Sequence, residues 1–168
     1  MGQQASLVVE VEIHAPVDVV QEVFQDFPSY KEWSTWSIES ADPTKEVNHL
    51  IHNDKLKVKI QNFKFDSTLL VSHPGFISET WLNKLWKNEP DVFEWNGGFG
   101  PLLQGAHEFS WRPSTKINGG TTFTQRESWH GWLVFLWKPG RIMGKKSYTT
   151  FNGFNIEVKK EAERRAAL

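Results

Sequence analysis

The most constraining feature of the sequence is the stretch from Ser6 to Trp33, in which one strand leads directly into a short amphipathic helix. Apolar residues largely alternate with polar ones from Leu7 to Ile13, as in a strand with one buried face. Ala15-Pro16 then ends the strand, because proline suits the first turn of a helix. Apolar residues next recur at spacings of three and four as far as Phe27. A second short turn is expected at Tyr30 to Trp33, so the sequence predicts a strand followed by two short helices.

The rest of the chain predicts antiparallel strands and one long helix. Residues 80–87 fit either a strand or an excursion from the sheet. No proline interrupts the sequence from Gly140 to Ala167, and apolar residues recur there at helical spacing, so we expect a helix of some 25 residues, about 37 Å long. No repeat or linker divides the chain, which predicts a single domain over residues 1–168 with a flexible leader at 1–5. Further strands are expected at 36–41, 55–60, 66–72, 91–95, 106–112 and 121–130.

Composition limits the classes of function. The 19 basic and 20 acidic residues nearly balance, so no bulk field favours nucleic acid as a partner. The chain has no cysteine, which excludes disulfides, thiol catalysis and thiolate metal sites. No apolar run approaches the ~20 residues that span a bilayer, and there is no secretory signal. We therefore expect a cytoplasmic protein without a metal or other cofactor, and its oligomeric state stays open.

The first residues, MGQQAS, fit the pattern for N-myristoylation at Gly2. The alternative is a plain disordered leader before the first strand. A single acyl chain gives only marginal membrane binding, and no cluster of basic residues follows Gly2 in the sequence. We therefore expect no stable membrane anchor.

The chain carries a set of characteristic motifs: APVDVV and DFPSYKEW near the start, the Gly105–Phe109 and Thr122–Gly131 segments on the last two strands, and Asn155 in the final helix. Together they resemble the SRPBCC or START-like superfamily, and the resemblance covers essentially the whole chain. The resemblance implies an α+β helix-grip fold. Such a fold has a curved antiparallel sheet of about six to seven strands, two short helices after the first strand, and a long C-terminal helix packed on the concave face.

The same resemblance implies a cavity between the sheet and the C-terminal helix that takes a small hydrophobic or aromatic molecule. The superfamily includes polyketide cyclase/dehydrase-type proteins, birch-pollen-allergen-like plant proteins and lipid-transfer domains, so membership alone does not decide the activity. The chain also has nine tryptophans and twelve phenylalanines, and so many large rings must line either a crowded core or a pocket.

Alternation along the strands selects the residues that face inward. On the last two strands the aromatic face is expected to look toward the final helix, and the neighbouring strands and that helix add further walls. The predicted ligand-binding residues on the strands are Leu69, Val71, Phe93, Trp95, Phe109, Trp111, Phe123, Gln125 and Trp129. Those on the final helix are Phe151, Phe154, Asn155 and Val158.

Polar residues at His107, Gln125 and Glu127 interrupt these apolar faces, and Asn155 is a fourth candidate. A buried carboxylate without partners responds by raising its pKa. Glu127 is therefore either paired, for instance with His107, Asn155 or an arginine, or it is poised as an acid or base. A single histidine on an apolar strand is more often a hydrogen-bonded wall residue. If the protein is an enzyme, Glu127 and His107 are the expected catalytic residues.

Two functions follow from these residues, and the sequence favours the first. The first is binding of a small hydrophobic ligand of the lipid, polyketide or isoprenoid type. The second is a cyclase or dehydratase that folds such a molecule into a reactive shape in the same cavity. The apolar cluster Trp132 to Trp137 is expected to be a lid or a helix-entry plug. If it is exposed, it is instead a contact patch for a partner or a membrane.

Overall fold

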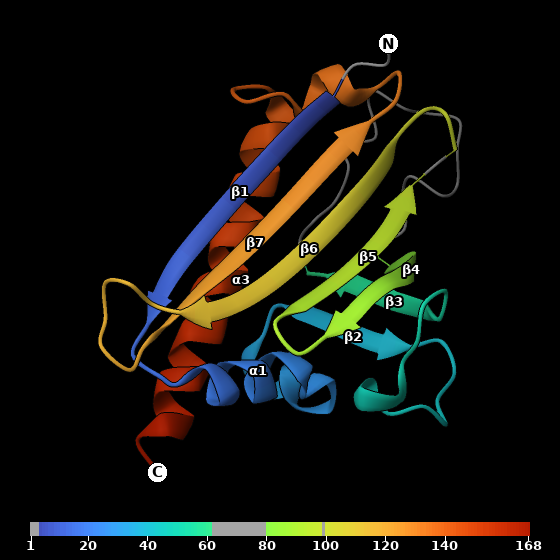
Figure 1. The fold of residues 1–168 in the computed structure, drawn as a ribbon. Helices are drawn as coiled ribbons and strands as arrows, with labels where there is room; N and C mark the ends of the chain where they lie inside the picture. Colours follow the sequence, from blue (N-terminus) through green and yellow to red (C-terminus); the bar gives the residue numbers. More distant parts are fainter. Residues whose placement is uncertain (1–3, 62–79, 99) are drawn as a thin grey trace.

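The computed structural model describes residues 4–61, 80–98 and 100–168. Within them the chain forms a sheet of seven strands, two short helices after the first strand, and a long C-terminal helix (Figure 1). The strands are β1 (Gln4–Ile13), β2 (Trp36–Ser40), β3 (Lys55–Ile60), β4 (Thr80–Glu89), β5 (Val92–Gly98), β6 (Gln104–Pro113) and β7 (Thr121–His130). The helices are α1 (Val17–Gln25), α2 (Tyr30–Trp33) and α3 (Ile142–Ala166), and short 3-10 turns lie at η1 (Phe27–Ser29), η2 (Val47–His49) and η4 (Val134–Trp137).

The sheet is antiparallel, with the strand order β1-β7-β6-β5-β4-β3-β2. The first strand therefore pairs with the last one, and β2 lies at the opposite edge. Helix α3 runs behind β1 and β7, and α1 crosses the end of the sheet near the C-terminal half of α3 (Figure 1). This is the α+β helix-grip architecture that the sequence predicted.

Local sequence explains most of these elements. In β3, every second residue is buried, as expected for its alternating lysines and aliphatic residues. In α1, the buried face is Val20, Val23 and Phe24, and the helix ends just before Phe27-Pro28. Residues 80–87, for which the sequence left two alternatives, lie in a strand. The strand expected at 66–72 lies outside the described residues.

Helix α3 is 25 residues long, as expected, and hydrogen bonds fix it to β1 and to the end of α1. The side-chain amide of Asn155 donates to the carbonyl of Val9 at 3.1 Å, and Lys159 donates to the carbonyl of Glu12 at 2.6 Å. Near its C-terminus, the Arg165 guanidinium donates to Asp26 at 2.8 Å, which ties α3 to the end of α1. Among the described residues no helix combines the length and the apolar character needed to cross a bilayer.

Phe24 of α1 fills one half of the concave face. Its ring lies 4.8 Å from that of Phe109 and 5.1 Å from that of Trp111, and four further rings lie around it, including that of Phe27. Tyr30 of α2 is fully buried in the same region. Its hydroxyl donates to the Phe24 carbonyl at 2.6 Å. We call this region the filled half of the core. Its other rings are Phe93, Phe123 and Phe154.

Candidate functional site

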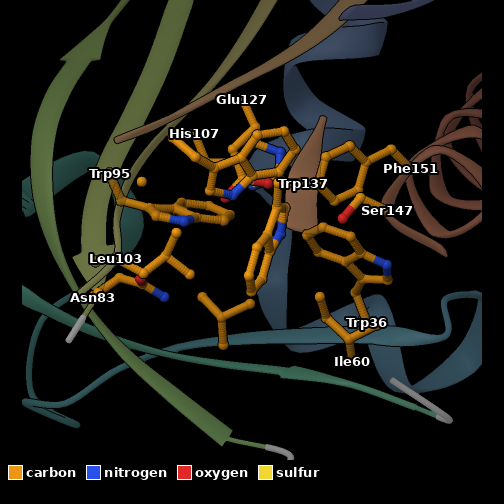
Figure 2. Close-up of a pocket in the computed structure, with 15 residues that line it drawn as sticks. Trp36, Ile60, Asn83, Trp95, Leu103, His107, Glu127, Trp137, Ser147 and Phe151 are labelled. Carbon is orange, nitrogen blue, oxygen red and sulfur yellow. The ribbon is translucent and has the colours of Figure 1, made fainter. Parts of the chain in front are cut away.

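The other half of the concave face holds a pocket, between the sheet, η4 and the first turns of α3 (Figure 2). Its volume is about 90 Å³. Most of its wall is aromatic or aliphatic, with a few polar side chains. It is lined by Trp36, Val58, Ile60, Asn83, Trp95, Gly97, Gly98, Leu103, Gly105, His107, Glu127, Trp129, Trp137, Ser147 and Phe151.

Three of the lining residues form one row across neighbouring strands. Trp95 of β5 is the register partner of His107 on β6, and His107 is in turn the partner of Glu127 on β7. Because residues opposite one another on adjacent strands share a face, the sheet presents this row toward α3. The imidazole of His107 lies between rings, 5.2 Å from Trp95 and 4.7 Å from Phe151 of α3.

The Glu127 carboxyl is neutral at neutral pH. Burial raises the pKa of Glu127 to about 8, and the hydrogen bond from the Trp129 indole opposes this rise only in part. The side chain keeps 18% of its surface exposed, so the carboxyl lies at the pocket wall rather than deep in the core. Gly105 makes room for it, because a Cβ at this position would lie 3.1 Å from Glu127 Oε1 and 3.2 Å from the Trp129 ring.

His107 is also neutral, since burial lowers the pKa of its imidazole to about 3. The Gln125 side-chain amide donates to Nε2 of His107 at 2.8 Å, which leaves the ring proton on Nδ1. That Nδ1 faces the Glu127 carboxyl, and it lies 3.6 Å from Oε2 of Glu127. The pair is therefore a contact between two uncharged groups and not an ion pair. Among the described residues, Glu127 forms no ion pair with an arginine, and the side-chain amide of Asn155 donates to the Val9 carbonyl instead.

The structure brings five of the sequence-predicted site residues together at the pocket: Trp95, His107, Glu127, Trp129 and Phe151. The remaining predicted residues in the described part of the chain face inward and are buried, but they are not among the lining residues. Their rings and side chains belong to the filled half or lie under α3: Phe93, Phe109, Trp111, Phe123, Gln125, Phe154, Asn155 and Val158. Leu69 and Val71 lie outside the described residues. Contact of any of these residues with a ligand stays a prediction.

Several lining residues were missed by the sequence analysis. Trp36, Val58 and Ile60 lie on the inward faces of β2 and β3, and the same alternation rule that selected Trp95 would have found them. Trp137 and Ser147 carry no such signal, because Trp137 lies in a 3-10 turn and Ser147 is a small polar residue on the buried side of a helix. Among the described residues, no group of three or more histidine, aspartate or glutamate side chains could hold a metal ion.

Trp36 joins the pocket to the filled half. Its ring lies 6.0 Å from Phe151 at the pocket and 4.7 Å from Phe154 in the filled half. The indole is 2% exposed, and its Nε1 has no hydrogen-bond partner within the part of the chain that the structure describes. A buried donor without a partner is costly, and it is unusual in a packed interior.

Comparison with known proteins gives matches only among solved structures, since no protein-family model and no curated protein sequence matches the chain. The aromatase/cyclase Zhui from Streptomyces sp. R1128 superposes with a TM-score of 0.64 at 16% identity, over 97% of this chain and 96% of that one. The hypothetical protein jhp0584 from Helicobacter pylori gives a TM-score of 0.63 at 10% identity, over 95% and 88% of the two chains. Norcoclaurine synthase from Thalictrum flavum, in complex with dopamine and hydroxybenzaldehyde, gives 0.58 at 10% identity, over 95% and 86%.

Each of these likenesses spans nearly the whole of this chain at low sequence identity, so what is shared is the arrangement of the backbone. That arrangement agrees with the strand order and with the placement of α3 described above. The chain therefore shares its fold with these solved structures, and the helix-grip arrangement that the sequence predicted is confirmed at the level of the fold.

Proposed function

We propose that the protein binds a small, mostly apolar molecule of about one aromatic ring in the pocket between the sheet and α3. The observation that carries this proposal is the hollow itself, a space of about 90 Å³ in a core that is otherwise packed with rings. Protein interiors rarely leave such voids, because unfilled space forfeits packing energy. An engineered apolar cavity of about 150 Å³ takes up benzene, so the present volume suits a single ring better than an extended lipid chain.

The walls support an aromatic ligand with one or two polar substituents. Trp95, Trp129 and Phe151 offer ring faces and edges, which favour stacked and edge-on contacts with another ring. The neutral Glu127 carboxyl can both donate and accept a hydrogen bond, and Nε1 of Trp36 is a donor without a partner among the described residues. A phenol or a carbonyl on the ligand would complement these groups. The neighbouring proteins include an aromatase/cyclase and a synthase holding dopamine and hydroxybenzaldehyde, which agrees with an aromatic ligand.

Isothermal titration calorimetry with hydroxybenzaldehyde, dopamine and a saturated fatty acid tests this proposal. We expect saturable binding of at least one aromatic probe and weaker binding of the fatty acid. Ser147→Leu places extra carbons in the pocket and should abolish the binding, whereas the matched control Thr149→Leu, on the exposed side of the same helix, should leave it unchanged. Saturable binding that survives Ser147→Leu would place the ligand elsewhere, and tight binding of the fatty acid alone would reject an aromatic ligand.

A second candidate function, acid–base catalysis of the cyclase or dehydratase kind, rests on the state of Glu127. A carboxyl that keeps its proton at neutral pH can donate it to a carbonyl or hydroxyl oxygen of a bound molecule. The carboxylate left behind would accept a hydrogen bond from the Trp129 indole and would face the Nδ1 proton of His107, whose nitrogen lies 3.6 Å away. His107 is a weak base because its pKa is low, so its role in this scheme is to orient and stabilise Glu127.

Glu127→Gln separates the two functions. The amide keeps the size and the hydrogen-bonding capacity of the neutral carboxyl but cannot transfer a proton. We expect ligand affinity to change by less than about threefold, and the turnover of a cyclising or dehydrating reaction to fall by ~10²-fold or more. Affinity and turnover can both be measured on one preparation once an aromatic ligand has been found by calorimetry. A variant that turns over as fast as the parent chain would remove Glu127 from the chemistry and leave the binding function.

A further inference from the structure

Strand β7 ends and helix α3 begins at the same end of the molecule (Figure 1). Large apolar side chains of this part of the chain are exposed. In the turn between these elements, Trp132 is 78% exposed and Phe135 is 46% exposed. On the first turns of α3, Ile142 is 60% exposed and Tyr148 is 52% exposed. Single exposed apolar residues are common on proteins, but a tryptophan exposed to this extent beside three other large apolar side chains indicates a contact surface.

The turn that carries these rings is fixed to the body of the protein. The backbone N–H of Leu133 donates to the Leu102 carbonyl at 2.9 Å, and that of Trp132 donates to the Pro101 carbonyl at 3.3 Å. Val134 and Trp137 are buried on the inner side of η4, which leaves Phe135 on the outer side. Ile142, Lys145 and Tyr148 follow one another at a spacing of three and so share the outer face of α3. The rings are therefore held outward by the fold.

The same end of the molecule is basic, although the chain as a whole has a net charge of −1. The sequence from Ser128 to Ile156 contains four lysine or arginine residues and no aspartate or glutamate. Lys138, Arg141 and Lys145 are exposed, and none of them forms an ion pair with another described residue. The C-terminal end of α3 differs, because Arg164 and Arg165 there are both paired with Glu161.

We propose that this end of the molecule docks on the surface of an anionic lipid bilayer. We call it the docking end and define it as Trp132, Phe135, Lys138, Arg141, Ile142, Lys145 and Tyr148. Tryptophan and tyrosine favour the interface between lipid and water, and lysine and arginine beside them are attracted to anionic headgroups. The combination of rings and unpaired cations on one surface fits a bilayer better than it fits a second copy of this chain, whose docking end would carry the same charge.

The docking end borders the pocket. Trp137 lines the pocket from η4, and Phe135 and Lys138, on either side of it in the sequence, are exposed on the docking end. Strand β1 also begins here, because Gln4 is the register partner of His130. Acylation at Gly2, one of the two alternatives that the sequence leaves open, would add a second membrane contact just before this strand in the sequence. The docking proposal rests on neither the acyl chain nor a ligand in the pocket.

Co-sedimentation of the unacylated chain with lipid vesicles tests the proposal. We expect binding to vesicles of phosphatidylcholine mixed with phosphatidylserine, little binding to phosphatidylcholine alone, and weakening with added salt. Neutralising Lys138, Arg141 and Lys145 to glutamine should lower the partition coefficient by about fivefold for each residue. Trp132→Ala combined with Phe135→Ala should lower it by tenfold or more. None of these five residues lines the pocket, so calorimetric binding of the aromatic probes should be unchanged.

Matched controls lie elsewhere on the surface. Trp86→Ala removes a tryptophan that is 49% exposed on β4, and Lys160→Gln removes a cation far along α3. Both should bind vesicles like the parent chain, and near-ultraviolet circular dichroism should show that every variant is folded. Absence of binding to anionic vesicles overturns the proposal, as does equal loss of binding in the controls. Self-association that depends on Trp132, without vesicle binding, would assign the surface to a second copy of the chain instead.

Discussion

On strand β6, Phe109 and Trp111 lie in the filled half of the core, whereas His107 lies at the wall of the pocket. All three residues face the same side of the same strand, and all three are buried. The difference comes from what covers them. Phe24 of α1 packs on Phe109 and Trp111, whereas among the described helices and turns it is α3 and η4 that contribute side chains to the pocket at His107. A strand face therefore becomes core or pocket according to the helix that covers it.

The two halves also differ in their titratable groups. The filled half is made of rings, and the hydroxyl of Tyr30 bonds to a backbone carbonyl. The pocket holds two titratable side chains, Glu127 and His107, and burial drives each to its neutral form. The gain in packing energy is enough to explain why the filled half is made of rings. The pocket instead keeps polar groups that cost stability, and function is the usual reason for such a cost.

The largest expected effect is loss of the central ring of the filled half. Phe24→Ala should lower the free energy of unfolding by about 3–5 kcal/mol, because the six rings around Phe24 cannot close the resulting cavity. Urea denaturation followed by far-ultraviolet circular dichroism measures this change. Phe135→Ala, at a half-exposed position, serves as the control and should change stability by less than about 0.5 kcal/mol. A loss below about 1 kcal/mol for Phe24→Ala would mean that this half is not tightly packed.

The next effect is a pH dependence that originates in the pocket. The pKa of Glu127 is raised from 4.5 to about 8, so between these pH values the carboxyl ionises in the unfolded chain but stays protonated in the folded one. The contribution of Glu127 to the free energy of unfolding is therefore fully present below pH 4.5 and is lost as the pH rises toward 8. Glu127→Gln should remove this pH dependence. In the parent chain the free energy of unfolding should fall by on the order of 2 kcal/mol over this range, after allowance for solvent at the pocket wall.

His107 acts in the opposite direction and at lower pH. Its pKa is lowered from 6.5 to about 3, so it reduces stability as the pH falls below 6.5. Denaturation curves recorded above pH 6.5 therefore report Glu127 with little contribution from His107. Parallel pH profiles for the parent chain and Glu127→Gln over that range would contradict a protonated carboxyl at the pocket wall.

A smaller effect is the difference in stability loss between alanine variants of two phenylalanines in α3. Phe154 packs in the filled half, against Phe24, Tyr30, Trp36 and Phe109, whereas Phe151 faces the pocket. Phe154→Ala should therefore destabilise the fold by about 1–2 kcal/mol more than Phe151→Ala, because fewer packed atoms surround Phe151. Thermal and urea unfolding of the two variants, side by side, give this difference. Equal losses would indicate that the pocket wall is packed as tightly as the filled half.

The smallest expected effect on stability is that of filling the pocket. Ser147→Leu adds apolar volume where space already exists, so the free energy of unfolding should change by less than about 1.5 kcal/mol, while binding of aromatic probes is lost. Urea denaturation and calorimetry on the same preparation measure the two effects. A destabilisation of several kcal/mol would show that the space near Ser147 is already filled by neighbouring side chains.

Sequence periodicity predicted most of the fold, and its one ambiguous strand has a physical explanation. Residues 55–60 alternate cleanly and form β3. Residues 80–87 do not alternate cleanly, and the pairing of β4 with β5 shifts register between Leu85 and Lys87. Such a bulge inserts an extra residue and so breaks the period of two. The strand was therefore hidden by an irregularity that only pairing with β5 reveals.

The pocket was harder to predict than the sheet. Alternation identified the inward face correctly for Phe109, Trp111 and Phe123, but it cannot tell which part of that face a helix covers. Trp95, Trp129 and Phe151 follow the same rule and line the pocket. The distinction depends on where Phe24 lies in space, which no local pattern encodes. The exposure of Trp132 is likewise decided by backbone bonds to the loop before β6.

The pairing of β1 with β7 has a consequence for how the chain reaches its native state. Gln4 lies opposite His130 and Ile13 opposite Thr121, so a strand made first during synthesis must wait for a strand made near the end. Until then, the edge of β1 offers unsatisfied N–H and C=O groups to other nascent chains. Contacts between residues so far apart in sequence also slow folding. Chaperone demand during synthesis should accordingly last until β7 has left the ribosome.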